Sequence, residues 1–202
     1  MIVVKLGGSY AYSPLLRPWL TAIEAARGEA VIVPGGGPFA DSVRAAQARM
    51  GFGDQAAHEM ALLAMTQYAV ALVSLSAGLV LADSLASIEA ALIAGRVPVW
   101  NPWPMLRDSD DVPASWDITS DALSIWLAQR LRAPSLLFIK RRAARAGAGP
   151  RELSINGLLD PASPRLIEHY GGAVYIAGPD DVPEALDPRA PPGRRIPARK
   201  AA

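Results

Sequence analysis

Short apolar runs alternate along the chain with longer segments in which apolar residues recur at helical spacing. The short runs, rich in β-branched residues, predict strands at residues 1–6, 30–33, 97–101, 135–140 and 173–177. The longer segments predict helices over residues 14–27, 38–50, 54–76, 83–95 and 119–131. Strands that alternate with helices predict an α/β protein whose mostly parallel sheet is covered on both faces.

The remaining segments are rich in proline. Residues 102–117 predict an irregular loop, and a chain of 202 residues has the length of one domain. We therefore expect a single domain over residues 1–187. A proline- and arginine-rich tail over residues 188–202 would be either mobile or strapped to the body.

Residues 60–82 are apolar enough to raise the question of a membrane span. Several polar residues interrupt the stretch, and Glu59 and Asp83 flank it closely. A helix buried in a soluble protein or in a subunit interface is the favoured interpretation. We expect no membrane association and a homo-oligomer.

Composition narrows the function classes. The formal net charge of +1 gives no reason to expect a nucleic-acid partner. The chain has no cysteine, which excludes disulfides, thiolate metal sites and a cysteine nucleophile. The N-terminus lacks the apolar region of a secretory signal, so we expect a cytoplasmic protein.

Two of the predicted strands are each followed by a run of glycines. The first is followed by Gly7, Gly8 and Ser9, and the second by Gly35, Gly36 and Gly37. Glycines at the carboxyl ends of neighbouring parallel strands bring backbone N–H groups close to an anion, so the pair predicts a phosphate site. Tight strand–helix turns are the alternative explanation. Neither junction matches G-x-x-x-x-G-K-S/T or G-x-G-x-x-G, so a dinucleotide-dependent oxidoreductase has no support.

Three charged residues accompany the glycines. Lys5 shares a strand face with Gly7 and needs an anionic partner, unless it extends to the rim of the sheet. Lys140 ends a later strand and precedes Arg141 in a basic cluster that suits phosphate oxygens or forms a solvated loop. Asp121, in the first turn of the helix at 119–131, could hold both lysines by charge pairing.

Other polar residues have two interpretations each. Asp117 or Thr119 could cap the helix that contains Ser120 and Asp121, or these residues could face a ligand. Asp41 follows the second glycine junction by one helical turn and could point back towards an acceptor. His58 is either structural or part of the pocket. No histidine metal motif occurs, so the metal ligands are unknown.

Four of these signals occur in the order found in a known family. The segments KLGGS, VPGGGPFAD and TSDALSIWLA, with a lysine that ends the next strand, resemble the amino acid kinase family over residues 1–140. Within it, AHEMALLAMTQYA and WDITSDALSIWLA look most like the short kinases of methanofuran biosynthesis, which act on an aminomethylfuran phosphate.

The resemblance implies a three-layer αβα sandwich that binds ATP and Mg²⁺ and phosphorylates a small anionic acceptor. Lys5, Asp121 and Lys140 would then be catalytic: Lys5 would stabilise the transferring phosphoryl group, Asp121 would orient the lysines, and Lys140 would neutralise charge on the nucleotide side. The nucleotide side would include Gly7, Gly8, Ser9, Arg141 and Gly157. The acceptor side would include Gly35, Gly36, Gly37, Asp41, His58, Asp117, Thr119 and Ser120.

One segment departs from the family pattern. The strand that holds Lys140 is usually followed by an aspartate–glycine turn leading to the adenine pocket, and here KRRAARAGAGPREL follows instead. A remnant lies around Gly157 and Asp160. The departure leaves a second hypothesis open, a non-catalytic protein of the same fold that binds an anion or serves as a partner subunit.

Overall fold

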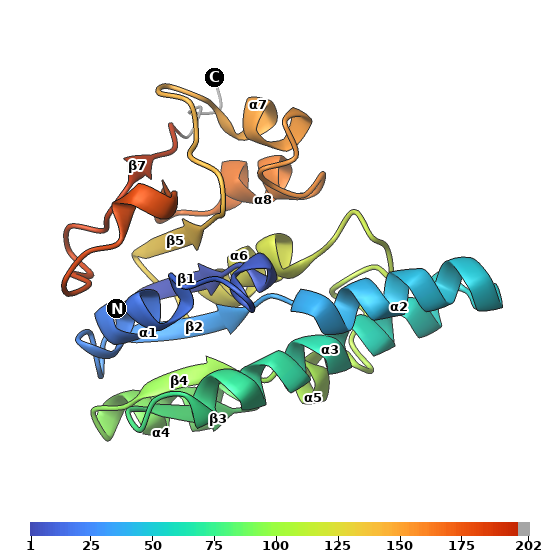
Figure 1. Cartoon of the computed structure of the whole chain (residues 1–202), viewed down its shortest axis with the longest axis horizontal. Helices are drawn as coiled ribbons and strands as arrows, with labels where there is room; N and C mark the ends of the chain where they lie inside the picture. Colours follow the sequence, from blue (N-terminus) through green and yellow to red (C-terminus); the bar gives the residue numbers. More distant parts are fainter. Residues whose placement is uncertain (198–202) are drawn as a thin grey trace.

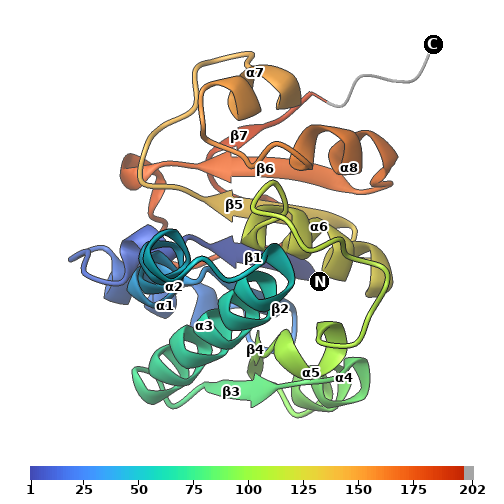
Figure 2. The ribbon, with the colours of Figure 1, turned by 90° about the vertical axis from the view of Figure 1, so that its right-hand side faces the viewer.

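The computed structural model describes residues 1–197 of the chain, and these contain one seven-stranded sheet (Figures 1 and 2). Its spatial order is β3-β4-β2-β1-β5-β6-β7. All neighbouring strands pair in parallel except β6 and β7. The strands are β1 (Ile2–Leu6), β2 (Ala30–Pro34), β3 (Leu79–Ala82), β4 (Val97–Trp100), β5 (Ser135–Ile139), β6 (Ala173–Ala177) and β7 (Arg194–Arg195).

Eight α-helices and two short 3₁₀ turns connect these strands within residues 1–197. The helices are α1 (Leu16–Glu24), α2 (Gly37–Met50), α3 (Asp54–Ser74), α4 (Leu85–Ile93), α5 (Trp103–Leu106), α6 (Ser120–Arg130), α7 (Pro150–Ile155) and α8 (Ser163–His169). The 3₁₀ turns are η1 (Gly8–Tyr10) and η2 (Pro179–Asp181). Figure 1 shows α2 and the first half of α3 extending together beyond the sheet.

Two apolar cores lie on opposite faces of the sheet. Alternate residues of β1 divide between them, with Val3 in one core and Ile2 and Val4 in the other. The Val3 core contains residues of α6 and α8, and the other contains residues of α1 and α3. The predicted three-layer αβα architecture with a mostly parallel sheet is confirmed.

All five predicted strands are present, and the structure adds the two-residue strand β7 and, before β4, the strand β3. This strand follows α3 after a turn of only four residues. Because the apolar helix and the apolar strand run together in the sequence, periodicity alone did not separate them. The predicted irregular loop at 102–117 also contains one short helix, α5.

The helix α3 is long and apolar enough, by length and composition alone, to cross a membrane. In the fold it packs against α2, α5 and strands β2, β3 and β4, and buries seven of its residues. One side of this helix therefore belongs to the apolar cores of the domain. Its outward side keeps Met60, Leu63 and Val70 exposed.

The C-terminal segment lies against the body as far as it is described. β7 extends the sheet beside β6, the Ile196 N–H donates to the Val174 carbonyl at 2.8 Å, and the Ile196 side chain is buried. Residues 188–197 thus have the strapped arrangement, whereas residues 198–202 lie outside the described residues. The domain boundary at residue 187 stays a prediction.

Candidate active site

The two glycine junctions lie side by side at the carboxyl edge of the sheet. β1 is the central strand, with β2 on one side and β5 on the other. Leu6, the last residue of β1, pairs with Pro34 of β2 and with Ile139 of β5. The glycines after β1, the glycines after β2 and Lys140 after β5 therefore meet at one edge, where open parallel sheets bind their ligands.

These glycines pack against one another. A Cβ atom on Gly8 would lie 2.2 Å from the Gly37 nitrogen, and one on Gly35 would lie 2.3 Å from the Gly8 nitrogen. Gly37 also has a φ of +55°. Close approach of two backbone loops thus requires glycine here even without a ligand.

The same packing leaves amide groups available to an anion. Within residues 1–197 the N–H groups of Gly8 and Gly36 have no hydrogen-bond acceptor. Both residues line a cavity, and Gly36 lies at the N-terminus of α2. Unpaired amides at a helix N-terminus favour a negatively charged ligand.

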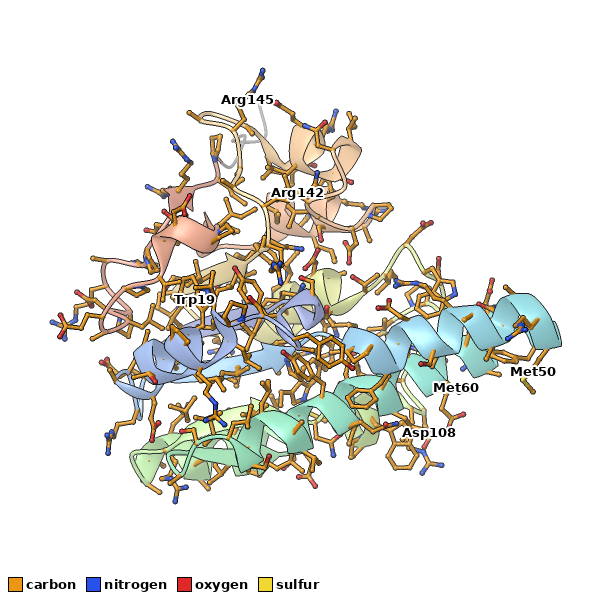
Figure 3. The ribbon with its side chains drawn as sticks, viewed as in Figure 1. Trp19, Met50, Met60, Asp108, Arg142 and Arg145 are labelled. Atoms are coloured by element: carbon orange, nitrogen blue, oxygen red, sulfur yellow. The ribbon has the colours of Figure 1, made fainter. Side chains whose placement is uncertain are left out.

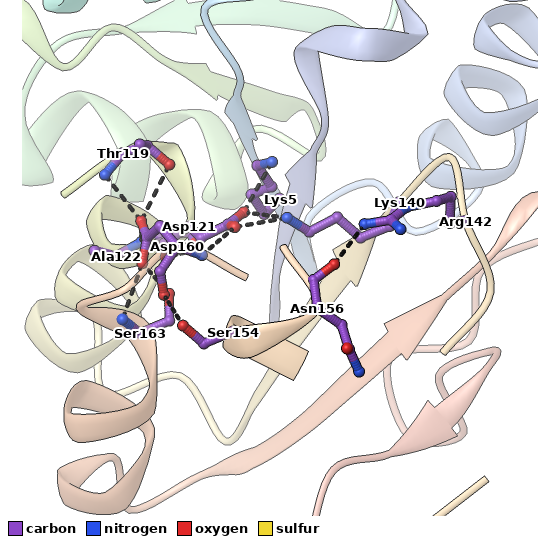
Figure 4. Close-up of polar contacts among 11 residues, drawn as sticks. Lys5, Thr119, Asp121, Ala122, Lys140, Arg142, Ser154, Asn156, Asp160 and Ser163 are labelled. Carbon is purple, nitrogen blue, oxygen red and sulfur yellow. Dashed lines mark hydrogen bonds and ion pairs between the residues drawn. The ribbon is translucent and has the colours of Figure 1, made fainter. Parts of the chain in front are cut away.

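Asp121 lies between Lys5 and Lys140 (Figure 4). Its Oδ1 is 2.9 Å from the Lys5 Nζ, and its Oδ2 is 2.6 Å from the Lys140 Nζ. The side chains of Lys5 and Asp121 are buried, with 7% and 5% exposed, and Lys140 retains 14%. Two ammonium groups on one carboxylate leave a net positive charge next to the glycine amides.

Burial and charge shift the pKa values of this group. Burial favours the neutral form of Asp121, but the charges of Lys5 and Lys140 outweigh it and hold its pKa at about 2. Burial, reinforced by the charge of Lys5, lowers the pKa of Lys140 to about 8 although Asp121 opposes the shift. Lys140 therefore begins to lose its charge near the upper end of the physiological pH range.

Asp160 holds the start of α6 in place. Its Oδ2 accepts hydrogen bonds from the Thr119 N–H at 2.8 Å and from the Ala122 N–H at 3.0 Å, and its Oδ1 accepts from the Ser163 N–H at 2.9 Å. The Asp160 N–H in turn donates to Asp121 Oδ2 at 3.2 Å. Thr119 occupies the N-cap position of α6, as one of the two interpretations of the sequence has it, but the carboxylate that accepts from the first amides belongs to Asp160.

A cavity of about 280 Å³ opens beside this charged group. It contains most of the predicted site residues: Lys5, Gly8, Ser9, Gly35, Gly36, Gly37, Asp41, His58, Thr119, Ser120, Asp121 and Lys140. The structure thus gathers residues from five separate segments of the chain into one pocket.

Four predicted residues lie outside the cavity lining. Gly7 does not line it, and its N–H donates to the Ile139 carbonyl at 3.3 Å. Arg141 donates to the Ser9 carbonyl at 3.3 Å and stacks on Tyr10. Gly157 follows the end of α7, and Asp117 is exposed and lines a different hollow, between α6 and α8.

The basic loop between β5 and α7 turns away from the cavity. Arg142 donates to the Asn156 carbonyl at 2.9 Å, and Arg145 forms an ion pair with Glu152 at 2.9 Å. Figure 3 shows both arginines on this loop, on the side of the molecule that carries α7. These contacts hold the loop against α7.

Comparison with known proteins identifies the family. Residues 1–142, more than half of the chain, match the amino acid kinase family. The chain belongs to this family. The matched region includes Lys5, both glycine junctions, Asp121 and Lys140.

Two relatives illustrate the likeness within the amino acid kinase family. The chain is 30% identical over 134 residues to the (5-(aminomethyl)furan-3-yl)methyl phosphate kinase of Methanocaldococcus jannaschii, an alignment that covers 65% of this chain and 61% of that protein. The chain thus spans less than two thirds of the length of that relative. The uridylate kinase of Archaeoglobus fulgidus superposes with a TM-score of 0.69 at 17% identity, over 97% of this chain and 99% of the other.

An isopentenyl phosphate kinase has a similar fold, with a TM-score of 0.62 at 18% identity over 98% of this chain and 100% of the other. Identities this low establish the shared fold. Within this fold, the group formed by Lys5, Asp121 and Lys140 is the feature of the chain that most clearly indicates a binding site for an anion.

The far end of the cavity contains residues that the sequence did not single out. Arg44 of α2, Asp54 of α3 and Trp116 of the loop before α6 line it together with Asp41 and His58. The Trp116 indole N–H donates to Gln47 of α2, 69 positions away in the chain. No local pattern in the sequence could have indicated this contact.

Proposed function

We propose that the protein is a small-molecule kinase that transfers the γ-phosphoryl group of ATP to a phosphate monoester. The observation that supports this most directly is the Lys5–Asp121–Lys140 group beside two glycine junctions with free amides. Phosphoryl transfer needs positioning and charge neutralisation more than covalent chemistry by the protein, and this arrangement supplies both.

The position of each residue in the site predicts its role in phosphoryl transfer. An oxygen of the acceptor phosphate forms a bond to the γ-phosphorus as the bond to the β-phosphate oxygen breaks and ADP leaves. The acceptor is already anionic, so no general base is required. Lys5 and Lys140 would neutralise the charge on the transferring group, Asp121 would hold both ammonium groups in place, and the Gly8 and Gly36 amides would donate to phosphate oxygens.

Mg²⁺ would enter this site together with the nucleotide. Within residues 1–197 there is no group of three or more histidine, aspartate or glutamate side chains that could hold a metal ion. Mg²⁺ is commonly bound by one or two carboxylates together with substrate phosphates, so the phosphate oxygens would supply most of its ligands. Bound there, it would offset the negative charge of the phosphates.

The favoured acceptor is an aminomethylfuran phosphate, in the biosynthesis of a methanofuran-type cofactor of one-carbon metabolism. The relative from Methanocaldococcus jannaschii is named for that substrate. A structural neighbour is named for isopentenyl phosphate, also a phosphate monoester.

The test is turnover of ATP and Mg²⁺ with a panel of phosphorylated furans, isopentenyl phosphate, UMP and small carboxylates, read as ADP formation. We expect turnover with a phosphate monoester and a loss of at least 100-fold in kcat for Lys5→Ala, because one charge on the transferring group disappears. Arg27→Ala is the matched control, since Arg27 is exposed and outside the cavity. Absence of turnover with every acceptor would refute the proposal.

The second candidate is a non-catalytic protein of the same fold. The specific observation in its favour is the loop after Lys140, where Arg141 and Gly157 lie outside the cavity and no aspartate–glycine turn is present. Calorimetry separates the two. Tight binding of an anion or a protein without ATP–Mg²⁺ binding would support the non-catalytic protein.

We also propose a cytoplasmic homo-oligomer with no nucleic-acid or membrane partner. The exposed Met60, Leu63 and Val70 on one side of α3 support an interface there. The near-zero net charge gives no basis for binding nucleic acid.

A further inference from the structure

The far end of the cavity is built around Trp116. Its indole N–H donates to Gln47 Oε1 at 2.7 Å, and the Arg44 guanidinium lies 4.3 Å from the centre of its ring. The amide nitrogen of Gln47 donates to Asp54 Oδ1 at 2.9 Å. One side-chain amide thus fixes both an aromatic wall from the loop before α6 and a carboxylate at the start of α3.

The charges at this end are unevenly balanced. Asp41 and Arg44 offset each other across 3.5 Å. Asp54 has no ion-pair partner among residues 1–197, and its Oδ2 accepts no hydrogen bond there. Burial lowers the pKa of His58 and so favours its neutral ring. The far end therefore carries a net negative charge, opposite in sign to the lysine end.

The section between the two ends is apolar. Ala61, Leu62 and Met65 of α3 line it. A ligand that matches the whole cavity has an anionic group at one end, a small apolar or aromatic body, and a cationic group at the other end.

We propose that Asp54 selects acceptors that carry an ammonium group, with Trp116 as the aromatic wall against which the body of the acceptor lies. This inference rests on the proposed function, because it assigns the remote end of the same acceptor. An ammonium donates a charge-assisted hydrogen bond to the free oxygen of Asp54 and can also lie against an aromatic face. UMP and isopentenyl phosphate carry no ammonium group, so they could not form this contact with Asp54.

The experiment compares two ligands that differ only in the amine. Calorimetry measures the binding of (5-(aminomethyl)furan-3-yl)methyl phosphate and of its analogue with methyl in place of aminomethyl. Because Asp54 is exposed, we expect the amine to bind the wild type roughly 3- to 10-fold more tightly. In Asp54→Asn we expect this ratio to fall towards one.

Glu59→Gln is the matched control, because Glu59 is an exposed carboxylate on the same helix but does not line the cavity. It should preserve the ratio. Trp116→Phe retains a ring but loses the bond to Gln47, and we expect it to weaken binding of both ligands while the preference for the amine persists. Circular dichroism shows whether each variant is folded.

The outcomes separate this inference from the proposed function. Equal binding of the two ligands by the wild type, or an unchanged ratio in folded Asp54→Asn, would overturn the role of Asp54. If the wild type bound the amine more tightly but no acceptor gave turnover of ATP, the kinase proposal would be refuted while the ammonium site at Asp54 would be supported.

Discussion

At the scale of single residues, one carboxylate organises the candidate site. Asp121 contacts Lys5 and Lys140 and receives the Asp160 N–H, and its side chain is 5% exposed. A buried carboxylate in this position neutralises one ammonium and leaves the other to act on a phosphate. Its low pKa follows from these two neighbours.

Removal of that charge should be costly to the fold. We expect Asp121→Asn to lower the free energy of unfolding by about 3 kcal/mol, because two ammonium groups would be left buried without a counter-charge. Urea denaturation measures this, with Asp110→Asn as an exposed control. Since the folded pKa is below the ordinary value of 3.8, the contribution is present above pH 4 and is lost as the pH falls towards 2. If the free energy of unfolding of the wild type and of Asp121→Asn decreased identically as the pH fell from 4 to 2, the proposed contribution of the Asp121 charge would be wrong.

The pKa of Lys140 makes a prediction about alkaline pH. Its positive charge disappears as the pH rises through about 8, so we expect kcat/KM to decline above that pH. Lys140→Arg should move the decline to higher pH, since a guanidinium stays charged. Initial-rate pH profiles of the two proteins test this.

Stability should respond to the same titration in the opposite direction. The folded pKa of Lys140 lies below its ordinary value of 10.5, so the unfolded chain binds more protons between pH 8 and 10.5. The contribution of Lys140 to stability therefore rises over this range while activity declines. If loss of activity and loss of stability coincided, general unfolding would be the cause.

At the scale of elements, contact between the two glycine loops joins the end of β1 to the start of α2. We expect Gly8→Ala to destabilise the fold by about 1–3 kcal/mol, because its Cβ would collide with the backbone of Gly37. Gly171→Ala is the control, as a Cβ there meets nothing within 4 Å. Thermal unfolding of both variants gives the comparison. Equal stability would mean that the loops can separate freely.

Asp160 connects α6 to α8 by accepting from the first backbone groups of both helices. We expect Asp160→Ala to cost about 2 kcal/mol, near 1 for each helix end that loses its acceptor. Phosphoryl transfer should also slow, since the start of α6 positions Asp121. Denaturation and kinetic assays measure these effects. A variant with reduced stability but a normal rate would limit Asp160 to a structural role.

Local patterns were sufficient for most elements and for the central charged group. Lys5, Asp121 and Lys140 each lie beside a strand end or a helix start that short-range periodicity marks. Trp116 could not be found in this way, because it bonds to a residue 69 positions away. Asp160 was indicated only by the resemblance to the family, and its bond to Thr119, 41 positions away, has no local signal. The glycines were read as close to a phosphate, and the structure adds that they are close to one another.

At the scale of the whole molecule, the exposed apolar side of α3 is the candidate interface between copies of the chain. If Met60, Leu63 and Val70 form an interface, Leu63→Glu should convert the oligomer to a monomer, because a charge would be buried against apolar side chains. Light scattering after gel filtration measures the mass. Glu59→Gln, on the same helix, should leave the mass unchanged. A monomeric wild type would contradict the proposed interface.

Along the chain, Lys5 precedes the exposed stretch around Asp108 and Asp110, and Asp121 follows it. This order has a practical consequence. A chain cut there would give one fragment with Lys5 and both glycine junctions and another with Asp121, Lys140 and Asp160. Neither fragment alone would hold a carboxylate between two ammonium groups. The protein is thus suited to fragment complementation, in which recovered activity would report that two tethered partners have met.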